Sequence, residues 1–580
     1  MTTRPSTAEG VDAVLSGPPD ELTLTRLVTE AYGAMPGHEP RPASTPEYPT
    51  GERPTQPGPS PVESRPHAVA SGHAIPVEVP GIELPDAASG NHRATSATAA
   101  PATPAGQPPA DSTPELPREL AIEILRPARS DRPGPAFTLP DMSPAREPSF
   151  YFIEDRPRSR ESEAPVATGA PPHLDVEAVR RDFPILGERV HGRRLVWLDN
   201  AATTQKPQAV IDRLVEFYSH ENSNIHRSAH FLAARATDAY EGARSTVADF
   251  LGAPSATDVV FTRGATEAIN LVAETCGRSH VGPGDEIVIS HLEHHANIVP
   301  WQRLAAETGA TMKVIPVDDD GQLLLDAYRD LLSDRTRLVA VAHVSNVTGT
   351  IVPVREIVEM AHRVGAKVLI DGAQAVAHLV VDVQAMDPDF YVFSGHKVFG
   401  PTGIGALYGR SSCLEKLAPW QVGGNMISDV TFERTRFQHP PTRFEAGTGN
   451  IADAVGLAAA LDYVNRLRRP AIERYEHELI GYAVDEIRTV PGLRLIGTAA
   501  ARASVLTFVL EGCRPEDVGS ALDREGIAVR AGHHCAQPIL RRYGVETAVR
   551  ASLALYNTHA EVDLLVAALH RLATAARNRH

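Results

Sequence analysis

The sequence predicts an α/β fold around a mostly parallel sheet, preceded by a long extension without regular structure. From about residue 174 onward, short runs rich in apolar and β-branched residues alternate with helical patterns, which is typical of strand–helix units around a buried sheet. Before that point, residues 1–171 hold about 30 of the 48 prolines and none of the five lysines. Proline at this density removes backbone donors and blocks helices, so we expect this extension to be largely disordered.

Three short apolar stretches interrupt the proline-rich extension. Residues 21–32 and 118–125 have spacings compatible with a short amphipathic helix or strand, and Ser149-Phe-Tyr-Phe-Ile153 is an aromatic cluster. Because exposed aromatic side chains are costly in a solvated tail, we interpret these stretches as docking motifs that fold on a partner. Chance apolar clusters in a linker are the alternative.

The strands of the predicted sheet are short and lie between helical patterns. The first two are expected at Leu195–Leu198 and Asp258–Thr262. The others are expected at 286–290, 338–342, 367–370 and 389–393. Ligands of such sheets bind beyond the carboxyl ends of the strands. Asp371, Ser394 and Glu293 follow these strands, so they are candidates for a site at that edge.

Composition narrows the possible partners and compartments. A length of 580 residues allows two to four domains, and the net charge of −16 argues against broad binding of nucleic acid or anionic membranes. No stretch approaches about 18 uninterrupted apolar residues, and the polar start lacks the apolar core of a secretory signal. The four cysteines lack the spacing of a metal site or disulfide framework. We therefore expect a cytoplasmic protein.

Lys397 is one of only five lysines, because arginine carries nearly all the positive charge. Arginine cannot lose its proton, so a lysine retained in Ser394-Gly-His-Lys397 suggests imine chemistry with a carbonyl. Asp371 ends a predicted strand 26 residues earlier. An aldehyde cofactor with a pyridine ring needs both an imine-forming lysine and a carboxylate that keeps the ring nitrogen protonated. Alone, Asp371 could equally be a helix N-cap.

A phosphate site is predicted beside this lysine. Ala265 and Thr266 open a helix directly after a strand, where amide donors and the helix dipole favour an anion. Small residues at helix starts are common, so this signal is weak by itself. Ser394 and His396, which flank the lysine segment, would add hydroxyl and imidazole donors to the same phosphate.

Two pairs of histidines raise the question of a metal. His294 and His295 are adjacent, and adjacent residues of an extended segment point to opposite sides, so both binding one ion is disfavoured. One imidazole stacked on a flat cofactor and available for proton transfer is the preferred interpretation, with a structural role as the alternative. The segment His533-His534-Cys535 suggests zinc in the same way, but Cys513 lacks ligand spacing. No metal is expected.

Cys535 is the candidate nucleophile, although a cysteine is more often a buried apolar residue. A glycine, two histidines and Arg530 surround it, which indicates an exposed, flexible and electropositive loop that favours a reactive thiolate. Arg550, 15 residues further on, could clamp a substrate carboxylate with two hydrogen bonds.

Over residues 174–580, these blocks together resemble the SufS-like group of cysteine desulfurases, in the class V branch of fold-type I pyridoxal-phosphate enzymes. The resemblance implies a mostly parallel seven-stranded sheet sandwiched by helices, plus a smaller α+β domain. It implies a large domain at 200–445 that binds pyridoxal 5′-phosphate (PLP), and a small domain from 172–199 and 446–580 that carries the cysteine loop. It also implies a homodimer.

The resemblance further implies roles for individual residues. Lys397 would form the imine with PLP, Asp371 would pair with its ring nitrogen, and His294 would stack on the ring. Gln374 would bond the ring hydroxyl. The phosphate would be held by Ala265, Thr266, Ser394 and His396, and by Gly447 and Thr448 of the neighbouring subunit. The substrate carboxylate would be held by Asn346, Arg530 and Arg550.

The implied reaction converts L-cysteine to L-alanine and leaves a persulfide on Cys535. Lys397 would shuttle protons and His294 would protonate the product. The short Arg530-Ala-Gly-His-His-Cys535 form points to enzymes that pass the persulfide to a dedicated acceptor protein. The alternatives are a selenocysteine lyase acting on L-selenocysteine, an aminotransferase or epimerase without need of Cys535, a free enzyme that supplies Fe–S cluster assembly, and a storage or scaffold component.

Two features depart from ordinary members of this group. Ser228, Ala265, Thr348 and Gly449 replace the glycine, hydroxyl residue, leucine and proline that are usual at these positions, which affects loop rigidity and the choice of acceptor. The long extension resembles that of desulfurases packaged as cargo in family 2 encapsulin shells. Residues 1–171 would then direct packaging, with Phe150-Tyr-Phe-Ile153 as a docking patch.

Overall fold

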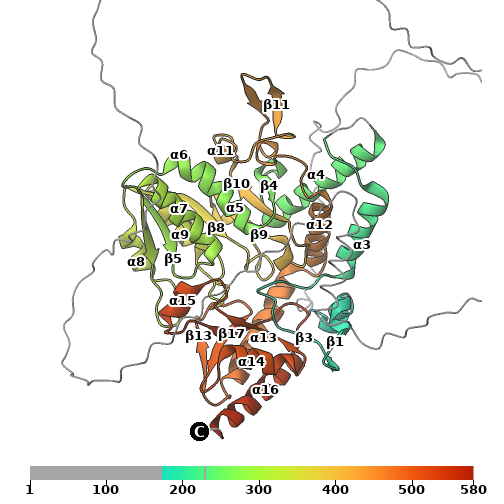
Figure 1. Cartoon of the computed structure of the whole chain (residues 1–580), viewed down its shortest axis with the longest axis vertical. Coiled ribbons are helices and arrows are strands. Elements are labelled where there is room, and N and C mark those ends of the chain that lie inside the picture. Colours follow the sequence, from blue (N-terminus) through green and yellow to red (C-terminus); the bar gives the residue numbers. More distant parts are fainter. Residues whose placement is uncertain (1–172, 227–229, 579–580) are drawn as a thin grey trace, which may run out of the picture. The chain divides into compact units, whose positions relative to one another are not determined.

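The computed structural model describes residues 173–226 and 230–578 (Figure 1). The disorder expected for residues 1–171, the three apolar stretches within that extension and Ser228 all lie outside the described residues.

The larger sheet has seven strands in the order β4-β10-β9-β8-β7-β5-β6. All of its strands run parallel except β10, which is antiparallel to both of its neighbours. The strands are β4 (Val259–Thr262), β5 (Glu286–Ser290), β6 (Thr311–Ile315), β7 (Thr336–Ala342), β8 (Lys367–Asp371), β9 (Phe390–Ser394) and β10 (Gly405–Gly409). The predicted mostly parallel, seven-stranded sheet is confirmed.

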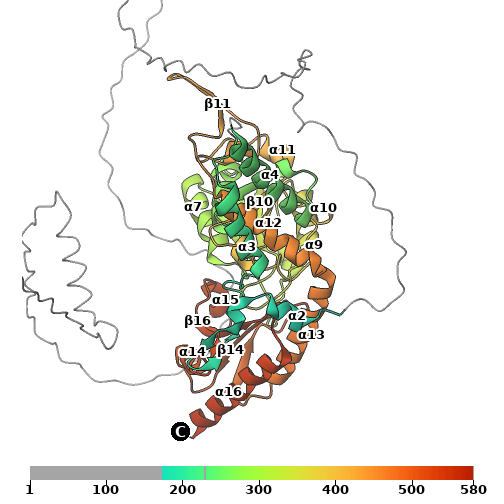
Figure 2. The ribbon, with the colours of Figure 1, turned by 90° about the vertical axis from the view of Figure 1, so that its right-hand side faces the viewer.

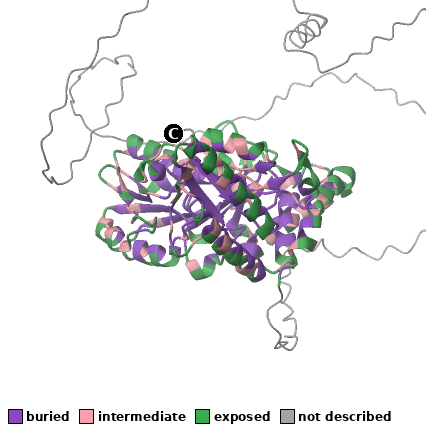
Figure 3. Ribbon diagram, turned by 90° about the horizontal axis from the view of Figure 1, so that it is seen from below, coloured by how far each residue is buried: buried purple, intermediate pink, exposed green. Residues whose placement is uncertain are grey.

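Helices cover both faces of this sheet, because successive residues of a buried strand point to opposite sides. Val339 and Val368 pack with α4 (Phe231–Leu251), α9 (Val354–Arg363) and α12 (Ile451–Arg466). Their sequence neighbours Leu338 and Leu369 pack with α5 (Ala265–Val272) and α7 (Val299–Thr308). Figure 3 shows the strands buried between helices whose outer faces are exposed, and Figure 2 shows α3 (Gln208–Glu216), α4 and α12 side by side.

A second, antiparallel sheet of four strands forms in the C-terminal part of the chain, in the order β13-β14-β17-β16. Its strands are β13 (Leu493–Ile496), β14 (Val505–Leu510), β16 (Arg530–Gly532) and β17 (Ala548–Ser552). The helices around it are α13 (Arg469–Ile487), α14 (Pro515–Asp523) and α16 (His559–Arg577).

The first expected strand exists but lies outside the larger sheet. It is β3 (Val196–Trp197), which pairs in parallel with β15 (Ile527–Ala528). The chain therefore begins its described part beside the C-terminal segment and only then enters the large sheet.

The remaining elements are α2 (Val176–Arg181), β1 (Arg189–Val190), β2 (Arg193–Arg194), α6 (Arg278–His280), α8 (Leu325–Leu331), α10 (Val383–Met386), α11 (Ser411–Leu414), β11 (Ile427–Val430), β12 (Thr435–Phe437) and α15 (Gln537–Arg542).

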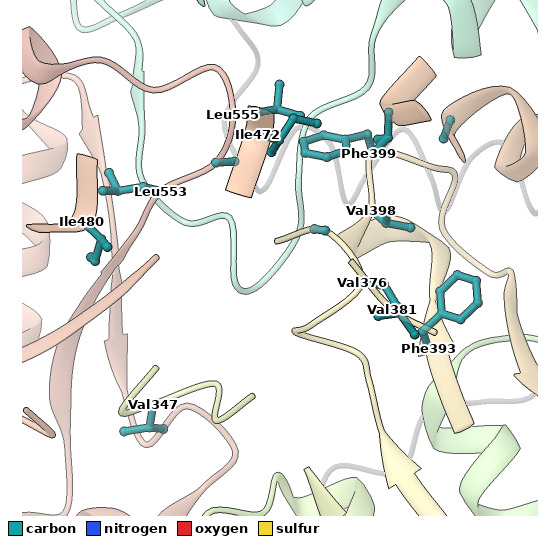
Figure 4. Packing of buried hydrophobic residues seen from close by; sticks show 14 of the residues in the cluster. Val347, Val376, Val381, Phe393, Val398, Phe399, Ile472, Ile480, Leu553 and Leu555 are labelled. Atoms are coloured by element: carbon teal, nitrogen blue, oxygen red, sulfur yellow. The ribbon is translucent and has the colours of Figure 1, made fainter. Parts of the chain in front are cut away.

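An aromatic cluster joins the two sheet regions next to the segment that carries Lys397. The ring of Phe183 packs edge-on against Phe399 and Tyr556, with centroids 6.0 and 4.7 Å away. Figure 4 shows Phe399 close to Ile472 and Leu555, which belong to the C-terminal part of the chain. The segment that follows β9 therefore packs against residues from both the beginning and the C-terminal part of the described chain.

Within residues 173–226 and 230–578, no helix is long and apolar enough to cross a bilayer.

Candidate active site

One cavity gathers twelve of the fourteen site residues predicted from the sequence. It opens beyond the carboxyl ends of β7, β8 and β9, where the larger sheet meets the C-terminal sheet. The predicted residues that line it are Ala265, Thr266, His294, Asn346, Asp371, Gln374, Ser394, His396, Lys397, Arg530, Cys535 and Arg550. Gly447 and Thr448 do not line it, and Thr448 borders a separate cavity.

Lys397 stands at the end of a short 3₁₀ turn, Gly395–Lys397, directly after β9. The carbonyl of its neighbour His396 accepts hydrogen bonds from the Thr204 backbone N–H at 3.0 Å and from Lys206 Nζ at 3.3 Å. On the other side, the Phe399 N–H donates to Thr204 Oγ1 at 2.7 Å. Burial lowers the pKa of Lys397 to about 8, against the opposing charge of Asp371. The backbone around Lys397 is therefore fixed, and the amine loses its proton more easily than an exposed lysine.

Asp371 is the last residue of β8, and its Oδ1 accepts a hydrogen bond from the Ala373 N–H at 2.9 Å. Burial raises the pKa of this carboxyl group. A Cβ added to Gly372 would lie 2.2 Å from the ring of Tyr391, so glycine is required for the chain to pass that ring. This packing turns the segment toward Gln374, whose Nε2 donates to the Ala201 carbonyl at 2.7 Å.

His294 lies on the loop after β5, and a buried network below it fixes this loop. Glu293 accepts hydrogen bonds from Asn297 Nδ2 at 2.6 Å and from the Ala342 N–H at 3.0 Å. His294 Nδ1 accepts from the Ala296 N–H at 3.1 Å. Burial lowers the pKa of His294 to about 3, helped by the charge of Lys397. The imidazole is therefore neutral near pH 7, with its proton on Nε2.

The start of α5 lines one end of the cavity. Gly264 precedes the helix at φ 152°, and the Ala265 N–H donates to Ser394 Oγ at 2.9 Å. A Cβ at Gly264 would lie 3.1 Å from that oxygen, so the absence of a side chain lets helix and strand approach closely. Thr266 follows in the first turn, and burial lowers the pKa of His396 to about 4.

Two arginines reach the cavity from the C-terminal sheet, and Asp199 links them. Arg550, on β17, donates from Nη1 to the Asn346 carbonyl at 2.9 Å and from Nη2 to Asp199 Oδ1 at 3.4 Å. Arg530, on β16, donates from Nε to Asp199 Oδ2 at 3.2 Å. The Nε of Arg550 and Oδ1 of Asn346 are buried without a partner. Burial lowers the pKa of Arg550 to about 10, so the guanidinium stays charged near neutral pH.

Asp199 was not among the predicted site residues. A carboxylate directly after a predicted strand was the available signal, and the same signal identified Asp371. The partners of Asp199 lie more than 300 positions away in the sequence, so only the fold reveals that it organises the arginines.

Cys535 lies on a loop whose backbone conformation is unusual. His534 and Cys535 have φ values of 51° and 54°, a left-handed conformation that costs free energy for residues other than glycine. Three contacts hold the loop: Asn346 Nδ2 to the His534 carbonyl at 2.7 Å, the His295 N–H to the Cys535 carbonyl at 2.7 Å, and His534 Nε2 to the Ala548 carbonyl at 3.0 Å. The thiol is half-buried at the cavity edge.

The segment with Gly447 and Thr448 is anchored by a buried ion pair. Arg244 and Glu445 meet at 2.6 Å with side chains 2% and 6% exposed, and Glu445 also accepts from the Phe261 N–H at 2.8 Å. The segment therefore has a fixed conformation but does not reach the cavity of its own chain.

The sequence of this chain also matches a known protein family. The Aminotransferase class-V profile matches residues 196–565.

The chain belongs to the class V aminotransferase family.

Its relatives in this family include a protein of Synechococcus elongatus named cysteine desulfurase, 60% identical over 464 residues that cover 77% of this chain and 74% of that one. A protein of Mycolicibacterium paratuberculosis named probable cysteine desulfurase is 52% identical over 536 residues, or 92% and 76% of the two chains. The crystal structure of the Escherichia coli cysteine desulfurase CsdA (S-sulfonic acid) has a TM-score of 0.65 at 40% identity, over 70% of this chain and all of that one. The similarity to this structure, together with the family match, confirms the predicted fold class.

Proposed function

We propose that this chain is a PLP-dependent cysteine desulfurase that converts L-cysteine to L-alanine and leaves the sulfur as a persulfide on Cys535. The observation that carries the proposal is the convergence of Lys397, Asp371, Arg550 and Cys535 on one cavity. These groups supply an amine, a carboxylate, a fixed cation and a thiol, which together suit a reaction on an amino acid that contains sulfur. The names of the relatives support the same reaction.

The cavity residues fit PLP. Asn346 Oδ1, His534 Nδ1 and Arg550 Nε are buried polar atoms without partners, which is a costly arrangement unless a ligand satisfies them. The close approach at Gly264 brings the amides of α5 next to Ser394, and helix N-termini are suited to phosphate. The cavity thus combines a site for an anion beside α5 with buried polar atoms that a bound ligand, cofactor or substrate, would satisfy.

We assign the residues that would hold PLP as follows. Lys397 would bond to its aldehyde, Asp371 would face its ring nitrogen, and His294 would lie on its ring. The phosphate would contact Thr266, Ser394, His396 and the first amides of α5, and Gln374 the ring hydroxyl. Gly447 and Thr448 would contribute from the second copy of a homodimer. When bound, PLP supplies a ring that withdraws electrons from the α-carbon of the amino acid.

Arg550 is positioned to bind the substrate carboxylate. It is buried and remains charged, and Asp199 and the Asn346 carbonyl fix its orientation. The Nε donor without a protein partner is available to the substrate. Charge-assisted bonds of this kind are stronger than neutral ones, and the planar guanidinium matches a carboxylate. Arg530, which shares Asp199, would add positive potential at the mouth of the cavity.

Lys397 is suited to move protons, and His294 is suited to donate a hydrogen bond beside it. With a pKa of about 8, the Lys397 amine exchanges its proton near neutral pH, which suits it as an acid and base at the substrate carbon. Neutral His294 presents its Nε2–H as a hydrogen-bond donor toward the reacting groups, and Lys397 delivers the proton.

Sulfur transfer is assigned to Cys535. Its thiolate forms a bond to the sulfur of the substrate, the bond between that sulfur and the substrate β-carbon breaks, and the β-carbon receives a proton. The balance is L-cysteine plus the Cys535 thiol giving L-alanine plus the Cys535 persulfide. The left-handed loop and its three anchoring bonds hold the thiol at the cavity edge, where an acceptor protein can take the sulfur.

The test measures alanine and persulfide formed by the purified PLP-loaded protein from L-cysteine. We expect Cys535→Ala and Lys397→Ala each to lower alanine formation by at least about a hundredfold, the scale of a lost acid–base or nucleophilic group. Cys513→Ala is the matched control, because Cys513 is also a partly exposed free thiol but lies outside the cavity. Full alanine release by Cys535→Ala would contradict the role of Cys535, whereas a keto acid or D-cysteine in place of alanine would favour an aminotransferase or epimerase. Running L-selenocysteine in parallel tests the selenocysteine lyase alternative.

We further propose that residues 1–171 direct packaging of the enzyme as cargo in an encapsulin shell. The matches to the Synechococcus and Mycolicibacterium proteins, over 464 and 536 residues, are longer than the whole of residues 173–580, so they extend into the extension. By contrast, the match to a Dickeya dadantii desulfurase covers 97% of that protein but only 69% of this chain. An extension shared by only some desulfurases supports a role beyond the reaction itself.

Packaging is tested by co-expressing a family 2 shell protein with the full chain or with residues 172–580. We expect only the full chain to co-purify with assembled shells and to resist added protease. Equal encapsulation of both forms would end the cargo proposal and leave the desulfurase proposal intact. Substituting Phe150, Tyr151 and Phe152 with alanine tests whether the aromatic cluster is the docking patch.

A further inference from the structure

Two imidazoles and a thiol converge beside the cysteine loop. One potential ligand atom from each of His295, His533 and Cys535 lies within 4.8 Å of the other two. The rings of His295 and His533 are stacked, with centroids 5.7 Å apart and planes 24° from parallel. The two histidines come from segments far apart in the sequence: His295 from the loop after β5, and His533 from the loop after β16.

The fold separates each pair of adjacent histidines. His294 and His534 line the cavity, whereas His295 and His533 do not. The sequence argument disfavoured a metal because two adjacent histidines point to opposite sides. The structure instead places one histidine of each pair beside the Cys535 thiol, so the three ligands come from two separate loops and none is used in holding the cofactor.

We propose that His295, His533 and Cys535 form a binding site for a zinc-like divalent cation. Zinc is bound in proteins by thiolate sulfur and imidazole nitrogen at about 2.0–2.3 Å in a tetrahedral arrangement. Ligand atoms in such a shell are closer together than 4.8 Å, so the three side chains must move slightly toward one another when the ion binds. Three protein ligands leave the fourth position to water, the pattern of an open rather than a structural zinc site.

The site is accessible and should release its ion again. His533 is exposed, and His295 and Cys535 are half-buried, so a solvated ion can enter. Each ring at present accepts a backbone N–H: His533 Nδ1 from Cys535 at 3.0 Å, and His295 Nε2 from Gln537 at 3.3 Å. Metal binding exchanges or rearranges these bonds, which offsets part of the metal–ligand energy and favours reversible binding.

The consequence for catalysis rests on the proposed function. Binding replaces the proton of the Cys535 thiol by the metal ion and releases that proton to solvent. A thiolate bound to zinc cannot attack the substrate sulfur. The cation would therefore inhibit sulfur transfer reversibly and shield the thiol from oxidation.

The test measures metal binding to the full-length PLP-loaded protein without added cysteine. Zn²⁺ affinity and stoichiometry come from calorimetry, and Co²⁺ serves as the spectroscopic probe, because thiolate-to-cobalt charge transfer and tetrahedral visible bands report the ligands. We use His533→Asn and His295→Gln, whose side-chain oxygens can still accept the backbone N–H groups. Cys535→Ser removes the sulfur, and His220→Ala, on an exposed histidine elsewhere, is the matched control.

We expect one ion per chain in the parent and the control, with a thiolate–cobalt band. Each of the three site variants should weaken Zn²⁺ binding at least about tenfold, since losing even an outer-shell partner costs roughly 10–100-fold. Parent-like affinity in His533→Asn and His295→Gln, no binding by the parent, or a cobalt spectrum without the thiolate band would overturn the site. Because the readout is binding, an inactive parent that still binds metal would refute the proposed function and leave the metal site standing.

Discussion

Arg550→Lys provides the sharpest test of how the substrate is bound. The guanidinium of Arg550 is buried, donates to the Asn346 carbonyl and to Asp199, and keeps one Nε donor without a protein partner. A lysine has a single ammonium group without the fixed planar fork, so it cannot satisfy both protein partners and also present a bidentate face to a carboxylate. At least one charge-assisted hydrogen bond to the substrate is lost.

The magnitude follows from the number of bonds lost. A hydrogen bond to a charged group contributes about 1.5–3 kcal/mol, and each 1.36 kcal/mol is a factor of ten in rate. We therefore expect kcat/KM for L-cysteine to fall about 10- to 150-fold in Arg550→Lys. The assay is alanine formation over a range of cysteine concentrations, with PLP content checked by absorbance and folding by circular dichroism.

Arg502→Lys is the matched control. Arg502 is half-buried, donates to the Val505 carbonyl at 2.8 Å, and has a buried Nε without a partner. Burial also lowers its pKa to about 10, but it lines a different cavity. We expect Arg502→Lys to leave kcat/KM within about twofold of the parent. If Arg550→Lys keeps parental kcat/KM with normal PLP content, then Arg550 does not bind the substrate carboxylate.

Two further predictions concern stability. Glu445→Gln removes the buried anion from Arg244, which keeps only the partly exposed Glu241, and should lower the free energy of unfolding by about 3–5 kcal/mol. By contrast, Glu359→Gln, in the exposed pair with Arg355, should change it by less than about 1 kcal/mol; equal losses in urea denaturation would refute the assignment. Burial opposes protonation of His378, but Glu476 at 2.6 Å outweighs it and raises the pKa of His378. The stabilisation by the His378–Glu476 pair is complete below about pH 6.5 and is lost as pH rises through the raised pKa of His378. Urea denaturation from pH 6 to 9 should therefore show a fall in stability that His378→Asn lacks. An identical pH dependence in His378→Asn would contradict the assignment of this effect to the His378–Glu476 pair.

The predicted strands that are continuous apolar runs are all confirmed, because a strand buried on both faces leaves a clear signal in the sequence. Two strands of the large sheet left no such signal. β6 is an edge strand whose residues are mostly exposed or half-buried, and β10 begins and ends with glycine. The Gly405 backbone lies so close to Phe393 and Gly264 that a Cβ would collide with both. Close packing, rather than strand propensity, selects that sequence.

The sequence by itself determined the α/β class and the chemistry of the candidate site, because residue types such as a rare lysine, a carboxylate after a strand and a thiol in a basic loop have few substitutes. Only the tertiary structure decided which of these groups meet. It brought twelve predicted residues to one cavity, left Gly447 and Thr448 outside it, and revealed Asp199 between two arginines. It also turned His295 and His533 toward Cys535. Contacts between residues hundreds of positions apart depend on how sheets and loops pack, and local sequence patterns do not encode that packing.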